Sequence, residues 1–251
     1  MNPSPSQPAV NDFGLIADVY DELVSWAPYE KWVKDLEARL QTRGLNRGDR
    51  ILDAACGTGL STVPWLDLGY RVVGVDHSPE MLRLAREKVE DREEDVGFHR
   101  QDLRELNFPR PFDAAVCLHS GLDYILDDEE LLKAFRSLRG TLGQGGLFAF
   151  DKCLDEPQFY RRNYTRRYSV SGGEAVFRYL WHPERRLFEQ RCVVRRRVRG
   201  RAPVSTEMVQ YLKAVSIAEL TDMLERAGFE VLEPPRQFSI SDPGLGICRA
   251  V

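Results

Sequence analysis

The sequence contains few cysteines, and the five that it has form no recognisable pair. They are odd in number, scattered along the chain and never spaced as C-x-x-C. A disulfide framework or a structural zinc site needs paired or clustered cysteines. We therefore expect reduced, mostly buried thiols in a cytoplasmic protein. The five are Cys56, Cys117, Cys153, Cys192 and Cys248.

The chain also lacks a long apolar run and a strong charge of either sign. No stretch is long enough to span a bilayer, which argues against contact with the membrane interior. A formal net charge of -4 argues against a general nucleic-acid binder. Residues 1–11 are rich in Pro, Ser, Gln and Asn and show no basic-then-apolar secretory pattern. We expect them to form a flexible N-terminus.

The remaining composition is typical of a soluble α/β protein. The 251 residues are 43% hydrophobic and 29% charged, which suits one domain with an insertion. Five segments are expected. They are a flexible N-terminus (1–11), a helical cap (12–48), an α/β core (49–155), an antiparallel insert (156–214) and a return to the core (215–251).

One stretch, Ile51 to Gly59, organises the chain. An apolar run ends in Asp53 and leads into a loop with Gly57 and Gly59, after which a helical pattern starts near Ser61. A strand, a glycine-rich turn and a helix form the first third of a nucleotide-binding βαβ unit. A close-packed turn without any ligand is the alternative reading.

The details of this loop bear on the ligand. A dinucleotide fingerprint has the spacing G-x-G-x-x-G, but Thr62 stands where the third glycine belongs. Asp53 at the strand end would repel a pyrophosphate and would suit a cationic ligand. Both features argue against NAD or FAD.

Acids follow the next two expected strands as well. The strand 70–75 ends at Asp76, where a carboxylate can accept hydrogen bonds from both hydroxyls of a ribose. The strand 96–100 is followed at once by Gln101 and Asp102. Because parallel strands bring their carboxyl ends to one edge of a sheet, we predict that Asp53, Asp76 and Asp102 lie on a common rim.

These motifs resemble those of class I S-adenosylmethionine-dependent methyltransferases. The likeness rests on D-x-x-C-G-T-G at Asp53–Gly59, the acids after the next strands, Phe112-Asp113, and Leu-x-x-Gly-Gly at 142–146. It implies a Rossmann-like α/β fold with a seven-stranded, mostly parallel sheet and helices on both faces, the last strand being antiparallel. It also implies S-adenosyl-L-methionine as the cofactor and S-adenosyl-L-homocysteine as its product. The implied cofactor contacts are Tyr20, Trp32, Asp53, Ala54, Gly57, Gly59, Asp76, His77, Met81, Gln101, Asp102, Leu103 and Leu118.

Helix and strand signals fill in this frame. Pro28 opens a helix with apolar residues at i, i+4 and i+8, Ser78-Pro79 starts another, and Ser216 to Glu219 is a capping box. A helix over 128–142 is expected to end at the glycines 143–146. Further strands are expected at 49–53, 112–118, 147–150, 229–232 and 246–251.

From residue 165 to about 214 the pattern changes to short period-two stretches with turn signals at 172–173 and 182–183. We predict an antiparallel sheet inserted after the fifth strand, similar to the substrate-covering lid of glycine N-methyltransferase-like enzymes. The segment is rich in arginine, which indicates either a solvent-facing surface or a site for an anionic substrate or RNA. The stretch 191–201 has no aromatic residue for base stacking, which favours the solvent-facing surface.

Methyl transfer from a sulfonium donor needs a general base only when the acceptor is protonated. His119, one residue past a strand end, and Tyr20 are the candidate catalytic residues. Asp123 and Tyr124 lie in the same loop. No D/N-P-P-Y/F/W stretch follows the fourth strand, which argues against the amino methyltransferases of adenine and glutamine that use it. No His/Cys/Asp cluster with metal-ligand spacing is present, so we predict no metal. The candidate substrate contacts are Tyr124, Tyr179, Trp181 and His182.

Three functions are consistent with these features. The preferred one is methyl transfer to a nitrogen or oxygen of a small molecule, in a monomer or homodimer that contacts no membrane. The second is an RNA or protein methyltransferase that uses the arginines of the insert. The third is a non-catalytic module that binds a nucleotide such as NAD.

Overall fold

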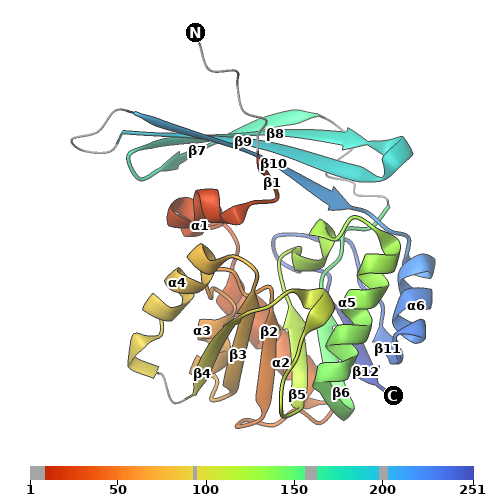
Figure 1. The fold of residues 1–251 in the computed structure, drawn as a ribbon. Helices are drawn as coiled ribbons and strands as arrows, with labels where there is room; N and C mark the ends of the chain where they lie inside the picture. The colour runs from red at the N-terminus through yellow and green to blue at the C-terminus, as the bar shows by residue number, and fades with distance from the viewer. Residues whose placement is uncertain (1–8, 93–94, 156–162, 198–202) are drawn as a thin grey trace.

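The computed structural model describes residues 9–92, 95–155, 163–197 and 203–251. Its elements form two layers (Figure 1), an α/β core below and an antiparallel sheet above, with helix α1 between them. We call the upper layer the lid sheet. The C-terminus lies in the core, beside strands β6 and β12.

The core sheet has seven strands in the order β11-β12-β6-β5-β2-β3-β4. All neighbours are parallel except β12, which runs antiparallel to both β11 and β6. This confirms the predicted mostly parallel sheet with a reversed last strand. The strands are β2 (Arg50–Ala54), β3 (Arg71–Asp76), β4 (Val96–Arg100), β5 (Phe112–Cys117), β6 (Leu142–Phe150), β11 (Phe229–Glu233) and β12 (Gly246–Ala250).

Helices cover both faces of this sheet. The α2 residues Trp32, Leu36 and Leu40 recur on one face and are each at most 1% exposed. Burying such a side chain contributes about 1.5–3 kcal/mol. Helices α2 (Tyr29–Gln41) and α3 (Thr62–Asp67) pack on one face, α5 (Asp128–Thr141) and α6 (Ile217–Arg226) on the other, and α4 (Pro79–Glu87) against β3 and β4.

Helix starts follow the capping signals of the sequence. The Ser78 hydroxyl accepts a hydrogen bond from the Met81 amide at the start of α4. At α6, the hydroxyl of Ser216 accepts from the Glu219 amide, and the Glu219 carboxylate accepts from the Ser216 amide. Both caps satisfy amides that have no partner inside the helix.

One boundary differs from the sequence prediction. The glycines at 143–146 do not end α5; they belong to β6, which begins at Leu142. The register between β5 and β6 shifts at this point, where Gly145 has a φ of 78°. The glycines therefore provide the irregular backbone through which the helix passes directly into the strand.

The lid sheet has five strands in the order β1-β10-β9-β8-β7. Alternate side chains, such as Phe177, Cys192 and Met208, turn inward and pack on Ile16 and Val19 of the N-terminal segment. The predicted antiparallel insert is therefore present. Its strands are β7 (Tyr164–Val170), β8 (Gly173–His182), β9 (Leu187–Arg196) and β10 (Val204–Lys213).

Part of the N-terminal stretch 1–11, which the sequence predicts to be flexible, forms a short strand. Strand β1 (Ala9–Val10) pairs in parallel with β10, and residues 1–8 lie outside the described part of the chain. The pairing gives hydrogen-bond partners to backbone groups of β10 that would otherwise be unpaired at the edge of the sheet. Helix α1 spans Ala17–Leu23. The short 3-10 helices are Phe13–Ile16, Glu90–Arg92, Leu103–Glu105, Gly121–Tyr124 and Pro183–Arg185.

In the described ranges, every helix is too short or too polar to cross a membrane.

The capping box at Ser216 gives a test of this fold. Ser216→Ala removes the hydroxyl that accepts from the Glu219 amide, so we expect a loss of about 1 kcal/mol in the free energy of unfolding. In a chain of this size that lowers Tm by about 2–4 °C, measurable by calorimetry. Ser205→Ala, on an exposed stretch of β10, is the control. Equal Tm values for the two variants would contradict the assigned cap.

Candidate functional site

Two adjoining cavities lie at the carboxyl ends of the core strands. The core cavity, about 440 Å³, is lined by the loops after β2, β3 and β4. The lid cavity, about 420 Å³, lies under the inner face of the lid sheet. Four aromatic side chains line both cavities, and we call them the neck. They are Phe13, Tyr20, His119 and Tyr124.

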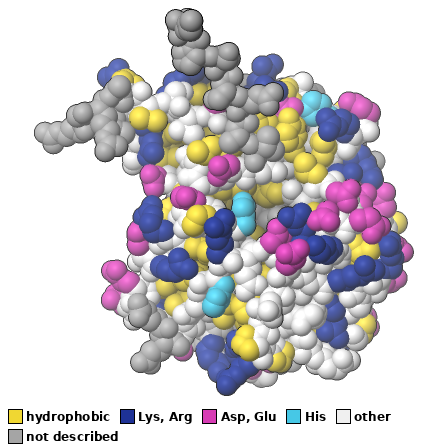
Figure 2. Space-filling model, in the orientation of Figure 1, with side chains coloured by type: hydrophobic (Ala, Val, Ile, Leu, Met, Phe, Trp, Pro, Cys, Tyr) yellow, Lys and Arg dark blue, Asp and Glu magenta, His cyan; other side chains and the backbone are white. Residues whose placement is uncertain are grey.

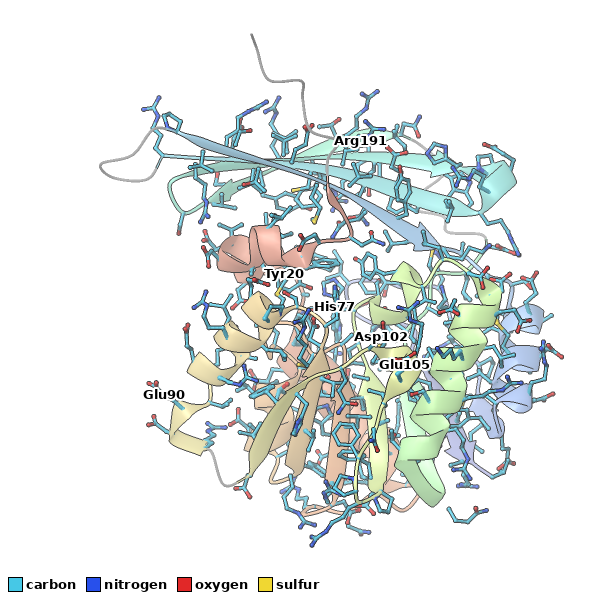
Figure 3. The ribbon with its side chains drawn as sticks, in the orientation of Figure 1. Tyr20, His77, Glu90, Asp102, Glu105 and Arg191 are labelled. Atoms are coloured by element: carbon cyan, nitrogen blue, oxygen red, sulfur yellow. The ribbon has the colours of Figure 1, made fainter. Side chains whose placement is uncertain are left out.

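The figures show the same arrangement. In Figure 2, apolar side chains are visible in the hollow between the lid sheet and the core, with charged and histidine side chains around it. Figure 3 shows Tyr20 on the core-facing side of α1, with His77 and Asp102 below it at the ends of core strands. The N-terminal segment therefore covers the cavity that the core strands open.

Asp76 and the glycine loop form one wall of the core cavity. The Asp76 carboxylate accepts hydrogen bonds from the Gly57 amide at 3.0 Å and the Ser78 amide at 2.9 Å. Gly57 has a φ of 54°, and a Cβ built there meets no atom within 4 Å. The backbone at Gly57 is thus open to a ligand, while Asp76 is held in place by two amides.

Asp53 lies behind this loop and does not line the core cavity. It is 1% exposed, and its Oδ2 accepts from the hydroxyls of Ser61 and Thr62 at 2.7 and 2.6 Å. Its Oδ1 is buried and has no hydrogen-bond partner among the described residues. Burial raises the pKa of Asp53 to about 6. Of the three aspartates predicted on one rim, only Asp76 and Asp102 face the cavity.

Asp102 is held by an arginine beside it. Its carboxylate accepts from the Arg104 amide at 2.9 Å and from Arg104 Nε at 2.8 Å, and Arg104 also reaches Glu130 at 2.7 Å. The hydrogen bonds from Arg104 lower the pKa of Asp102 to about 2. The cavity wall therefore carries a permanently charged pair here. The other predicted contacts that line this cavity are His77, Met81, Gln101 and Leu103.

Besides Asp53, four predicted cofactor contacts lie outside the walls of both cavities. Trp32 is buried and its Nε1 donates to the carbonyl of Ile240 at 3.1 Å. Gly59 has a φ of 84°, and a Cβ there would lie 3.3 Å from that of Ala85, so its role is close packing against α4. The remaining two, Ala54 and Leu118, are buried in or just after core strands.

His119 stands at the neck in an unusual backbone conformation. Both it and Ser120 have positive φ values, 66° and 71°, which non-glycine residues rarely adopt. The His119 Nδ1 and the Tyr29 hydroxyl are hydrogen-bonded, and the Trp26 ring lies 5.5 Å from the imidazole. Burial lowers the pKa of His119 to about 4, so the imidazole is neutral at pH 7 and a weak base. Burial likewise raises the pKa of Tyr20, which keeps its hydroxyl protonated.

The lid cavity contains two of the four predicted substrate contacts, Tyr124 and Tyr179. Tyr179 belongs to a stack of rings, with centroids 4.4 Å from Tyr164 and 5.9 Å from Phe177. The other two predicted contacts, Trp181 and His182, lie outside its walls. The Nε2 of His182 is 2.9 Å from a carboxylate oxygen of Glu189.

The sequence analysis did not select Asp151 as a site residue. Asp151 follows the last residue of β6, lines the lid cavity and is 4% exposed. It is the acid at the end of a further parallel strand, so the reasoning that selected Asp76 and Asp102 also applies to it. The same cavity contains Asp123 and Lys152, whose ion pair is 2.8 Å long.

Comparisons with known proteins agree with this geometry. Residues 51–146 match the family model described as a methyltransferase domain. A Bacillus subtilis protein named as a methyltransferase, YqeM, is 40% identical over 136 residues, 54% of this chain and 53% of that protein. The dTDP-3-amino-3,6-dideoxy-alpha-D-glucopyranose N,N-dimethyltransferase of Streptomyces fradiae is 29% identical over 168 residues, 66% of this chain and 62% of that enzyme. The chain thus spans about half the length of the first of these relatives.

Solved structures match over nearly the whole chain. An S-adenosylmethionine-dependent methyltransferase from Clostridium acetobutylicum has a TM-score of 0.79 at 22% identity, covering 96% of this chain and 99% of that one. DesVI of Streptomyces venezuelae has a TM-score of 0.78 at 23% identity, covering 94% and 98%. At such identities the likeness establishes the fold.

The fold and the matched domain together define a class. The chain has the class I, S-adenosylmethionine-dependent methyltransferase fold, with its glycine loop and strand-end acids in the expected order.

No group of three or more His, Cys, Asp or Glu side chains that could hold a metal ion occurs in the part of the chain that the structure describes.

The buried Asp53 predicts a pH dependence of stability. Its folded pKa of about 6 lies above the unfolded value of about 3.9, so the native state binds more protons between these values. The stability therefore falls as pH rises from about 4 to 6, by roughly 1.4 kcal/mol per pKa unit of separation. Asp53→Asn, which does not titrate, should lose less stability over this range in urea unfolding. The control is Asp222→Asn at an exposed position of α6. If the stability of D53N varied with pH in parallel with that of the wild type, the raised pKa of Asp53 would be contradicted.

Proposed function

We propose that this protein transfers a methyl group from S-adenosyl-L-methionine, held in the core cavity, to a nitrogen or oxygen of a small molecule held in the lid cavity. The observation that carries the proposal is the neck, because its four residues line both cavities, so two reactants held in the two cavities would lie next to each other there. One reactant lies over the strand ends and the other under the lid sheet.

The core cavity suits an adenosyl compound without phosphate. A dinucleotide needs free amides in the glycine loop, but the amides of Cys56, Gly57 and Gly59 donate to Val75, Asp76 and Cys56, respectively. Those amides are unavailable to a pyrophosphate. This argues against the alternative of an NAD-binding module.

Individual residues have the chemistry that such a ligand needs. Asp76 has acceptor capacity left for ribose hydroxyls, since each of its oxygens accepts only one amide. The Gln101–Leu103 loop and Met81 supply polar and apolar surface for an adenine ring. We therefore assign Asp76 to the ribose and residues 101–103 to the base.

The sulfonium of S-adenosylmethionine supplies a methyl group that is already activated for displacement. The protein's contribution is then orientation and exclusion of water. The neck residues are placed for both tasks, because they form the shared wall. Tyr20 has a protonated hydroxyl, and the neutral His119 is suited to hydrogen bonding more than to removing a proton.

The lid cavity favours a small acceptor over RNA or protein. It is a space of about 420 Å³ beneath the lid sheet, which matches a small molecule. Figure 3 shows Arg191 on the outer side of the lid sheet, directed away from the cavity, and Arg191 pairs with Glu189. Arg167, which lines the lid cavity, pairs with Glu174. Related enzymes are named for small acceptors, glycine and amino sugars among them.

A methyl-transfer assay tests the function. The protein is incubated with S-adenosylmethionine and a panel of amino sugars, amino acids and phenols, and S-adenosylhomocysteine is quantified by mass spectrometry. We expect turnover with at least one small acceptor and little change between about 50 and 200 mM salt, because binding inside a cavity does not depend on many phosphate contacts. Methylation of RNA alone, with strong salt dependence, would favour the alternative.

Cofactor binding tests the ribose assignment. Asp76→Asn removes the charge at the cavity wall, and we expect about ten-fold weaker binding of S-adenosylhomocysteine by calorimetry, the loss typical of a charged hydrogen bond. Asp113→Asn is the matched control, because Asp113 lies near the amino end of β5, at the opposite edge of the sheet. Unchanged affinity in D76N would show that Asp76 does not hold the ribose.

A further inference from the structure

Asp151 is a buried carboxylate: one of its oxygens accepts a hydrogen bond, and the other has no partner among the described residues. Its Oδ2 accepts from the Ser120 amide at 2.7 Å. Its Oδ1 is buried, and no described residue hydrogen-bonds to it. An isolated buried charge is costly unless a partner satisfies it, so such an atom indicates a ligand or a proton.

The neighbouring charges do not neutralise Asp151. Lys152 is fully buried, and its ammonium donates to Asp123 and to the carbonyl of Lys213. Asp123 also accepts from the Cys153 amide at 2.8 Å. The lysine charge is therefore matched by Asp123, which leaves Asp151 as a second, unmatched acid.

The cations that line the lid cavity from other described elements, Arg166 and Arg167 of the lid sheet, each have another partner. The neck contributes the neutral His119 and the protonated Tyr20, and Cys117 and Cys153 stay protonated because burial raises their pKa values. From the lid sheet, the Arg166 guanidinium lies 5.4 Å from the ring centre of Tyr164 and is exposed. Arg167 pairs with Glu174.

Two other carboxylates also have a buried oxygen without a partner among the described residues, but neither lines the core cavity or the lid cavity. They are Asp53, behind the glycine loop, and Asp155, which pairs with Arg186 at 3.0 Å. Neither lines a cavity. Asp151 alone of the three faces the space where an acceptor would lie.

We propose that the acceptor is a primary or secondary amine and that Asp151 anchors its ammonium group through Oδ1 and takes its proton. The inference rests on the proposed function, whose acceptor it specifies. Burial and the charge of Asp123 raise the pKa of Asp151 to about 7, which is suited to proton exchange near neutral pH.

The proton and electrons balance as follows. The bound ammonium gives one proton to the Asp151 carboxylate, which leaves a neutral amine with a lone pair. That lone pair forms the N–CH₃ bond, the S–CH₃ bond breaks, and its electron pair returns to the sulfur. The product is a methylated ammonium beside a protonated Asp151, whose proton leaves to solvent when the product departs.

The aromatic surroundings suit a cation. Phe13, Tyr20 and Tyr124 line the neck, and the centroids of Phe13 and Tyr124 are 4.9 Å apart at an interplanar angle of 77°. Ring faces attract ammonium groups, and methylated ammonium groups in particular. A hydroxyl acceptor would gain neither this attraction nor the charge of Asp151.

The test compares two probes of similar shape. 2-Phenylethylamine and 2-phenylethanol are titrated by calorimetry into the protein saturated with S-adenosylhomocysteine, at pH 8.5 and pH 5.5. We expect the wild type at pH 8.5 to bind the amine about ten-fold or more tightly than the alcohol. Asp151→Asn keeps an oxygen that can accept from the Ser120 amide but has no charge, so it should remove the preference for the amine. Asp155→Asn, the matched control, should keep it.

The wild type provides a second measurement that does not depend on the folding of a variant. An aliphatic ammonium stays protonated over this range, whereas Asp151 gains a proton below about pH 7, so the preference for the amine should largely disappear at pH 5.5. No amine preference in the wild type, an unchanged preference in D151N, or a preference that does not vary with pH would each overturn the proposal.

The same titrations separate this inference from the proposed function. Absence of S-adenosylhomocysteine binding contradicts the methyl-transfer function itself, and the probes are then compared without it. Normal S-adenosylhomocysteine binding with equal affinity for amine and alcohol overturns only the role of Asp151.

Discussion

The site depends on the carboxylate of Asp76, which ties three parts of the core together. Asp76 ends β3, accepts the amide of Gly57 in the loop after β2, and accepts the amide of Ser78 at the start of α4. These contacts fix the loop beside the cavity and occupy an amide that a phosphate would need. A single side chain thus shapes the core cavity and limits the kind of ligand that the cavity can take.

The second constraint is the position of the N-terminal segment between the two layers. Strand β1 pairs with β10 at the edge of the lid sheet, and the Asn11 side chain accepts from the Tyr211 amide at 3.0 Å. Phe13 and Tyr20 follow directly and line both cavities. The neck is therefore attached to the lid sheet as well as to the core, so residues that line both cavities are held by both layers.

The sequence predicts the core well because its signals are local. Periodicity, helix caps and acids after apolar runs placed the strands and put Asp76 and Asp102 on one rim. It was less successful where a position depends on packing between distant segments. The burial of Trp32 under Ile240 and the pairing of Ala9–Val10 with β10 both depend on such contacts. One sequence signal does distinguish two of the predicted substrate contacts. Alternation along β8 puts His182 on the face of the strand opposite Tyr179.

Burial also reverses the roles that reference pKa values suggest for His119 and Asp151. In water a histidine titrates near pH 6.5 and an aspartate near 3.9, so sequence reasoning selects the histidine as the base. Desolvation favours the neutral form of each group, which lowers the pKa of His119 to about 4 and raises that of Asp151 to about 7. The group that can exchange a proton near neutral pH is then the carboxylate. Since this exchange follows from enclosure between lid and core, the layer that covers the lid cavity also sets the acid–base chemistry available inside it.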